Sequence, residues 1–93
     1  MHDRLPKTAM KYKETREFTE KTVPKGLLAD HSTAEGVLGL IVILDGQLEY
    51  TRIGQGRIAV TPDRPAVVYP AEKHHVTCSR PVRFKVEFYR VPE

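Results

Sequence analysis

The alternation of apolar and polar residues along this chain predicts a protein built from short β-strands. The pattern is strictest over residues 82–89, where every second residue is apolar and the intervening residues are polar or charged. The apolar set is Val82, Phe84, Val86 and Phe88. Because successive side chains of a strand point to opposite faces, this segment predicts a strand with one buried face. Residues 47–53 follow the same rule, with Leu48 and Tyr50 on the inner face.

Residues 38–44 are apolar at nearly every position, which predicts a central strand covered on both faces. Asp45-Gly46 follows directly and is a strong signal for a two-residue hairpin into residues 47–53. Gly54-Gln55-Gly56 predicts the next turn. Pro62, Pro65 and Pro70 bracket a short apolar strand at 66–69, since none of these prolines can lie inside a central ladder.

The N-terminal part of the chain is less regular. Residues 1–15 are polar and basic without a clear period, which predicts a basic N-terminal arm or at most an edge strand. Residues 16–20 predict a short strand with Phe18 inward, and residues 27–33 predict a strand that leads to His31. We therefore expect an arm over 1–15 and a single domain over 16–93. Its seven or eight strands and at most one short helix make the fold class all-β.

Length and charge narrow the function classes. A chain of 93 residues forms one domain, and its 15 basic and 12 acidic residues are interleaved, so a net charge of +3 predicts an ordinary solvated surface. We do not expect nucleic-acid binding, because no basic stripe is interleaved with aromatic residues. The single cysteine, Cys78, excludes an intramolecular disulfide. With no signal peptide and no membrane-spanning apolar stretch, we expect a cytoplasmic protein without a membrane partner.

The histidines are the main candidates for chemistry. If residues 29–33 are extended, His31 and Thr33 point to one face with Cα atoms about 6.5 Å apart. His74 and His75 are adjacent, so only one of them can face the interior. His74 shares its face with Val76 and Cys78 and is the predicted inward residue, but a bulge after Pro70 would turn His75 inward instead.

Other reactive residues add little to this site. Cys78 lies about 13 Å along the strand from His74, too far for one metal ion, and is expected to pack as a small hydrophobe. Glu87 alternates against the apolar face, so it becomes a third ligand only if the opposite face lines the pocket. The sequence contains no paired-carboxylate site, phosphate-binding loop or nucleophile elbow, and it leaves open whether the protein is an enzyme.

Five motifs occur in a fixed order along the chain. They are His31-Ser-Thr33, Glu35-Gly-Val-Leu-Gly39, Ile43-Leu-Asp-Gly-Gln-Leu-Glu-Tyr50, Pro70-Ala-Glu-Lys-His74-His-Val76 and Phe84-Lys-Val-Glu-Phe-Tyr89. In this order they resemble the small cupin-like family that includes YeaR and the N-terminal domain of the tellurite-resistance protein TehB. The resemblance covers roughly residues 16–90. It implies a double-stranded β-helix, or jelly-roll barrel, and a link to tellurite resistance or nitrosative stress.

The resemblance also implies which residues form a site. The family's His-x-Thr element matches His31 and Thr33, and its Pro-x-x-x-His-x-Val element matches His74, whereas the wider cupin pattern selects His75. The chain departs from metal-binding cupins at three positions. These are Thr33 in place of a second histidine, Gly39 near the place of a glutamate, and Lys73 in place of an aromatic residue.

Two hypotheses of different classes follow. In the first, His31 and His74 bind a divalent transition metal (zinc, iron or nickel) or a small ligand inside the barrel, with water or Thr33 completing the site. In the second, the protein is a non-catalytic sensing or interaction module whose barrel mouth binds an oxyanion or a metabolite. In either case we expect a homodimer, because a small jelly roll leaves edge strands to be covered.

Overall fold

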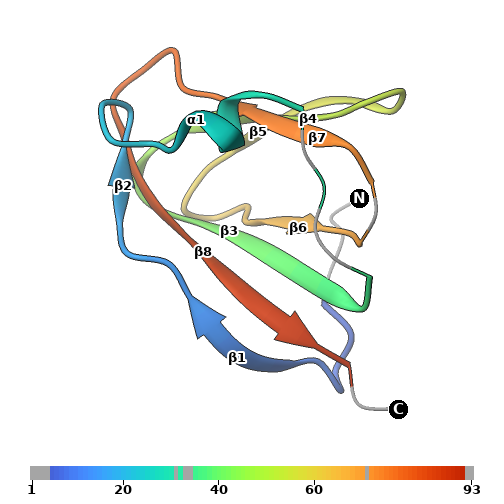
Figure 1. Cartoon of the computed structure of the whole chain (residues 1–93). Coiled ribbons are helices and arrows are strands. Elements are labelled where there is room, and N and C mark those ends of the chain that lie inside the picture. The colour runs from blue at the N-terminus through green and yellow to red at the C-terminus, as the bar shows by residue number, and fades with distance from the viewer. Residues whose placement is uncertain (1–4, 31, 33–34, 71, 92–93) are drawn as a thin grey trace.

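The computed structural model describes residues 5–30, 32, 35–70 and 72–91. The described residues form two antiparallel sheets and one short helix (Figure 1). The elements are β1 (Met10–Glu14), β2 (Phe18–Thr19), α1 (Lys25–Leu28), β3 (Val37–Gly46), β4 (Leu48–Arg52), β5 (Gly56–Val60), β6 (Ala66–Val68), β7 (His74–Thr77) and β8 (Val82–Arg90). One sheet has the order β1-β8-β3-β6 with β2 also paired to β8, and the other has the order β5-β4-β7. The predicted predominance of β-structure is confirmed.

The two longest strands, β3 and β8, form the centre of the larger sheet. They pair from Val37 opposite Arg90 to Gly46 opposite Val82, and β6 pairs with the other edge of β3. The face of β3 with Ile41 and Ile43 is buried, but Leu44 on the other face is 36% exposed, so the predicted cover on both faces is only partial. The alternation along β8 is as predicted, since Val82, Phe84 and Val86 are buried.

The predicted hairpin at Asp45-Gly46 is wrong. Both residues continue the pairing of β3 with β8, and β4 pairs with β5 and β7 instead of β3. A register shift between Ile43 and Asp45 and a positive φ of 79° at Gly46 bend the chain from one sheet into the other. Bulges and glycines commonly make such corners. The observed hairpin joins β4 to β5 through the turn at residues 53–55.

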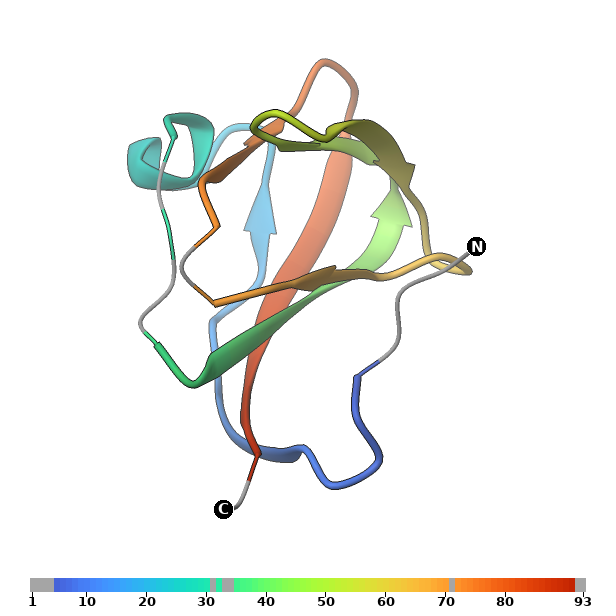
Figure 2. The same ribbon diagram turned by 90° about the vertical axis from the view of Figure 1, so that its right-hand side faces the viewer.

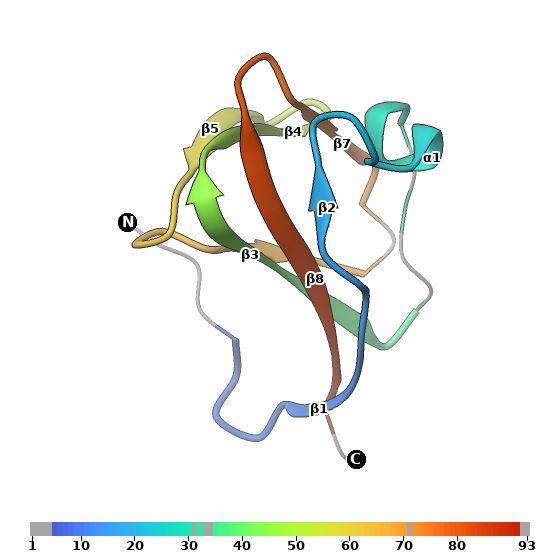
Figure 3. The ribbon, with the colours of Figure 1, turned by 90° about the vertical axis from the view of Figure 1, so that its left-hand side faces the viewer.

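The N-terminal region also departs in part from expectation. Phe18 is buried as predicted, but Leu27 and Leu28 belong to α1, so residues 27–33 do not start as a strand. Pro24 favours this helical turn with a φ of −60°, and its carbonyl accepts a hydrogen bond from Leu27 N at 3.0 Å. Residues 10–14 form the edge strand that the sequence left open as an alternative to an arm, and Figure 3 shows β1 and β2 following β8.

The hydrophobic core lies between the two sheets, which face each other in Figure 2. It draws on both of them, with Ile41 and Phe84 from the larger sheet and Leu48, Tyr50 and Val76 from the smaller one. Within the described residues, no helix has the length and apolar character needed to cross a membrane.

Candidate functional site: an apolar cavity between the sheets

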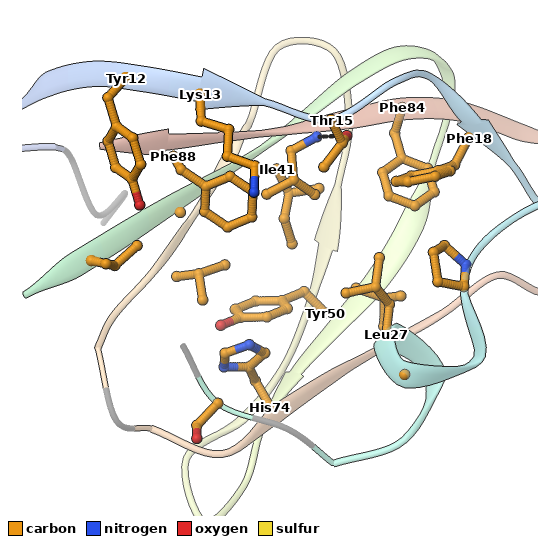
Figure 4. Close-up of a pocket in the computed structure, with 18 residues that line it drawn as sticks. Tyr12, Lys13, Thr15, Phe18, Leu27, Ile41, Tyr50, His74, Phe84 and Phe88 are labelled. Atoms are coloured by element: carbon orange, nitrogen blue, oxygen red, sulfur yellow. Dashed lines mark hydrogen bonds between the residues drawn. The ribbon is translucent and has the colours of Figure 1, made fainter. Parts of the chain in front are cut away.

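A cavity of about 530 Å³ lies between the two sheets (Figure 4). Most of its lining is apolar and comes from both sheets and α1. The lining includes Phe18, Leu27, Ile41, Val76, Phe84 and Phe88. Cavities of this size, mainly apolar and with a few polar groups, are typical of small-molecule sites. The cavity is therefore the candidate functional site.

His74 and Tyr50 are the deeply buried polar groups of the lining. The register of β4 with β7 pairs Tyr50 with Val76 and Arg52 with His74, so Tyr50 and His74 are diagonal neighbours on the inner face. Their ring centroids are 5.6 Å apart, and the side chains are 1% and 2% exposed. A neutral imidazole and a phenol can each donate and accept a hydrogen bond. The pair can therefore bind a polar group of a ligand inside an otherwise apolar space.

The two adjacent histidines, His74 and His75, lie on opposite faces of β7. His74 lines the cavity, whereas His75 lies on the outer face of β7, where its Nδ1 is 2.8 Å from Asp30 Oδ1. His31 and Thr33 lie outside the described residues. Ser32, between them in sequence, lines the cavity.

Strand β1 contributes a part of the lining that the sequence analysis did not anticipate. The register with β8 shifts between Lys11 and Lys13, so the extra residue Tyr12 and the next residue Lys13 both line the cavity. Lys13 Nζ lies 5.8 Å from the centroid of the Phe88 ring. No residue type in this segment marks a bulge, so alternation alone could not identify these two residues.

Thr15, which follows β1, forms two hydrogen bonds with β8. Its backbone N donates to Val86 O at 2.9 Å, and its Oγ1 accepts from Val86 N at 3.0 Å. Because Val86 also lines the cavity, these two bonds set the distance between the bulge of β1 and the apolar floor formed by β8.

Glu87 does not meet His74. It belongs to the outer face of β8, where it accepts a hydrogen bond from Tyr89 Oη at 2.7 Å and lies 3.2 Å from Lys85 Nζ. Burial opposes ionisation of Glu87, but the hydrogen bond from Tyr89 and the ammonium groups of Lys85 and Lys11 outweigh it and hold the pKa of Glu87 below its ordinary value. Glu87 thus belongs to an ionic cluster outside the cavity.

A metal site needs several ligating side chains close together, and the described residues do not provide them. They contain no group of three or more histidine, cysteine, aspartate or glutamate side chains that could hold a metal ion. Of these residue types, the described cavity lining supplies His74. Cys78 packs against the core, and burial raises the pKa of its thiol above the ordinary value, which disfavours the thiolate that binds metals.

Two facing antiparallel sheets around an apolar cavity define a class of small β-proteins. Within that class the chain belongs to the TehB-like domain family, whose model matches residues 13–86. The resemblance inferred from the sequence motifs is thus confirmed. No curated protein matches the chain in a sequence search.

Two solved structures share the fold. One is a protein from Escherichia coli K12, with a TM-score of 0.88 and 19% identity over 97% of this chain and 98% of that protein. The other is TehB from Haemophilus influenzae, with a TM-score of 0.83 and 22% identity over 91% of this chain. This chain covers 32% of the length of that TehB structure. At these identities the likeness concerns the fold alone.

Proposed function

We propose that this protein is a small-molecule-binding domain that takes a predominantly apolar ligand into the cavity between its sheets. The observation that carries the proposal is the cavity itself, about 530 Å³ and lined mainly by apolar side chains, with His74 and Tyr50 converging on it. A ligand that fills this space removes apolar surface from water, which contributes about 25 cal/mol per Å² buried. His74 and Tyr50 then fix its orientation by hydrogen bonding.

The inner face of the smaller sheet supports this function. Tyr50 belongs to the buried core together with Leu48 and Val60, and it pairs with Val76 across β4 and β7, so its ring is held in place before a ligand arrives. A site that is already ordered loses little conformational entropy on binding. We also propose the cupin-like jelly-roll connectivity for this fold, since the chain passes from the larger sheet to the smaller one and back.

A metal-dependent form of this site is the second proposal. It uses His74 together with His31, and the position of Ser32 in the cavity lining favours it, because Ser32 is the neighbour of His31. Two imidazoles would make an open, weak site for zinc, iron or nickel, in which water or a ligand completes the coordination.

Ligand binding can be tested with the neutral fluorescent probe N-phenyl-1-naphthylamine. We expect its fluorescence to rise with saturable, one-to-one binding to the wild-type protein. Val76→Phe replaces a small side chain of the lining with a phenyl ring that occupies the cavity, so it should abolish the rise in fluorescence. Ile58→Phe is the matched control, because Ile58 is 53% exposed on β5 and does not line the cavity. Circular dichroism confirms that each variant is folded. No binding by the wild type, or equal binding by Val76→Phe, contradicts the proposal.

A further inference from the structure

We propose that the ligand is an amphipathic anion whose apolar body fills the cavity and whose negatively charged head group binds Lys13 at the β1 side. This inference rests on the proposed function and adds the chemical class of the ligand. Its starting point is that Lys13 is the cationic residue of the described cavity lining, and that its ammonium lies beside the Phe88 ring, which also lines the cavity.

The charge of Lys13 is not neutralised within the described part of the chain. The neighbouring lysines have carboxylate partners on the outer face, since Lys11 pairs with Glu14 and Lys85 lies 3.2 Å from Glu87. Lys13 takes part in none of the ion pairs formed by the described residues, and its described contact is the ring of Phe88. The bulge at Tyr12 accounts for this difference between the lysines. It turns Lys13 toward the cavity, whereas Lys11 and Glu14 remain in the ionic cluster around Glu87.

A second cation lies at the same side. Arg90 stacks on the Tyr12 ring, with its Cζ 4.5 Å from the ring centroid, and Tyr12 lines the cavity. Arg90 also has no carboxylate partner among the described residues. Two positive charges beside an apolar cavity attract an anion and repel a cation, and low-dielectric walls strengthen both effects.

The exposure of Lys13 and His74 determines the orientation of the bound ligand. Lys13 is exposed, whereas His74 is 2% exposed. A head group at Lys13 keeps part of its hydration, but a head group at His74 would be a charge buried without a permanent counter-charge. The ionic head therefore stays at the β1 side, and the apolar chain extends toward Tyr50 and His74.

Three probes with the same ten-carbon chain and different head groups test this inference: decanoate, decanol and decyltrimethylammonium. Each is measured by its displacement of N-phenyl-1-naphthylamine below its micelle-forming concentration. We expect decanoate to compete about tenfold better than decanol, the size expected for one charge-assisted hydrogen bond, and decyltrimethylammonium to compete least. Added salt should reduce the advantage of decanoate by screening.

Lys13→Met should remove the advantage of decanoate over decanol. Lys21→Met is the matched control, because it removes one positive charge from an exposed residue outside the cavity lining. If the neutral probe binds but decanoate and decanol compete equally, the inference is wrong and the proposed function stands. The inference is also wrong if Lys21→Met has the same effect as Lys13→Met. If the neutral probe does not bind, the proposed function itself fails.

Discussion

At the scale of single residues, Gly46 is where the backbone conformation and the packing both require glycine. Its φ is +79°, and a Cβ at this position would lie 2.2 Å from Pro81 O. An L-residue pays about 1–2 kcal/mol for the left-handed conformation alone. The clash with the backbone must add to this, because Pro81 precedes β8 and cannot move without shifting that strand.

We therefore expect Gly46→Ala to lower the free energy of unfolding by about 3 kcal/mol or more. Gly54→Ala is the control, since Gly54 has a φ of +82° and nothing lies within 4 Å of its added Cβ. That variant should lose about 1 kcal/mol from backbone strain alone. Urea unfolding of both variants measures the difference. Equal losses would show that the contact with Pro81 does not restrict position 46.

The two adjacent histidines give a second prediction at this scale. If the cavity holds a divalent metal through His31 and His74, protein purified without an affinity tag should contain zinc, iron or nickel in stoichiometric amount. His74→Ala should lose the metal and His75→Ala should keep it, because His75 lies on the outer face beside Asp30. Metal affinity should fall as the pH drops through about 6.5, since a protonated imidazole cannot coordinate. Elemental analysis that finds the metal retained in His74→Ala contradicts this site.

At the scale of secondary-structure elements, β1 and β8 are joined on their outer face by an ionic cluster around Glu87. The pKa of Glu87 is below its ordinary value of 4.5 because the interactions with Tyr89, Lys85 and Lys11 outweigh the opposing effect of burial. The unfolded chain therefore takes up this proton at a higher pH than the folded protein does. The stabilisation is present above pH 4.5 and is lost as the pH falls through the lower, folded-state pKa.

Glu87→Gln should accordingly be less stable than the wild type at pH 7, by at most about 1 kcal/mol because the cluster is partly solvated. The difference should shrink as the pH falls below 4.5, because the carboxylate then takes up a proton first in the unfolded chain and, at still lower pH, in the folded protein. Urea unfolding of the two proteins at pH 7 and at a series of lower pH values measures this difference. A difference that does not change with pH would mean that the charge of Glu87 contributes nothing.

The same elements show what the sequence could and could not predict. The alternation in β8 identified its buried face because Val82, Phe84 and Val86 are buried, whereas the residues between them are exposed or half-buried. The Asp45-Gly46 signal was misread because local turn preference does not reveal that β3 is still paired with β8 at that point. The cavity residues Tyr12 and Lys13 were missed because a bulge, set by pairing with a distant strand, breaks the alternation of β1.

For the candidate site, face alternation around His74 placed this residue correctly in the interior and His75 outside. It also placed Tyr50 on the inner face, but nothing in the sequence indicated that Tyr50 and His74 would be diagonal neighbours across two strands. Such neighbours depend on the register between β4 and β7. Register is a property of the assembled sheet, so only the structure brings the two rings together.

At the scale of the whole molecule, the smaller sheet ends in an exposed edge strand. β5 pairs with β4 on one side, and no strand among the described residues pairs with its other side. Four of its five residues are exposed, including Ile58 at 53%. An open edge of this kind pairs readily with another chain. If two copies of β5 pair antiparallel about a two-fold axis through Ile58, both edges and both isoleucine side chains become covered.

We therefore expect a homodimer with twice the chain mass of 10.6 kDa, measurable by light scattering at high micromolar concentration. Ile58→Lys places two like charges at the centre of the paired strands and should shift the protein to a monomer, with about tenfold or greater weakening of association. Val91→Lys is the control, since Val91 is a 40% exposed residue that follows β8. A monomeric wild type would contradict the dimer. A dimer that persists in Ile58→Lys would rule out the β5 interface, because the charge pair cannot be buried there without a large loss of affinity.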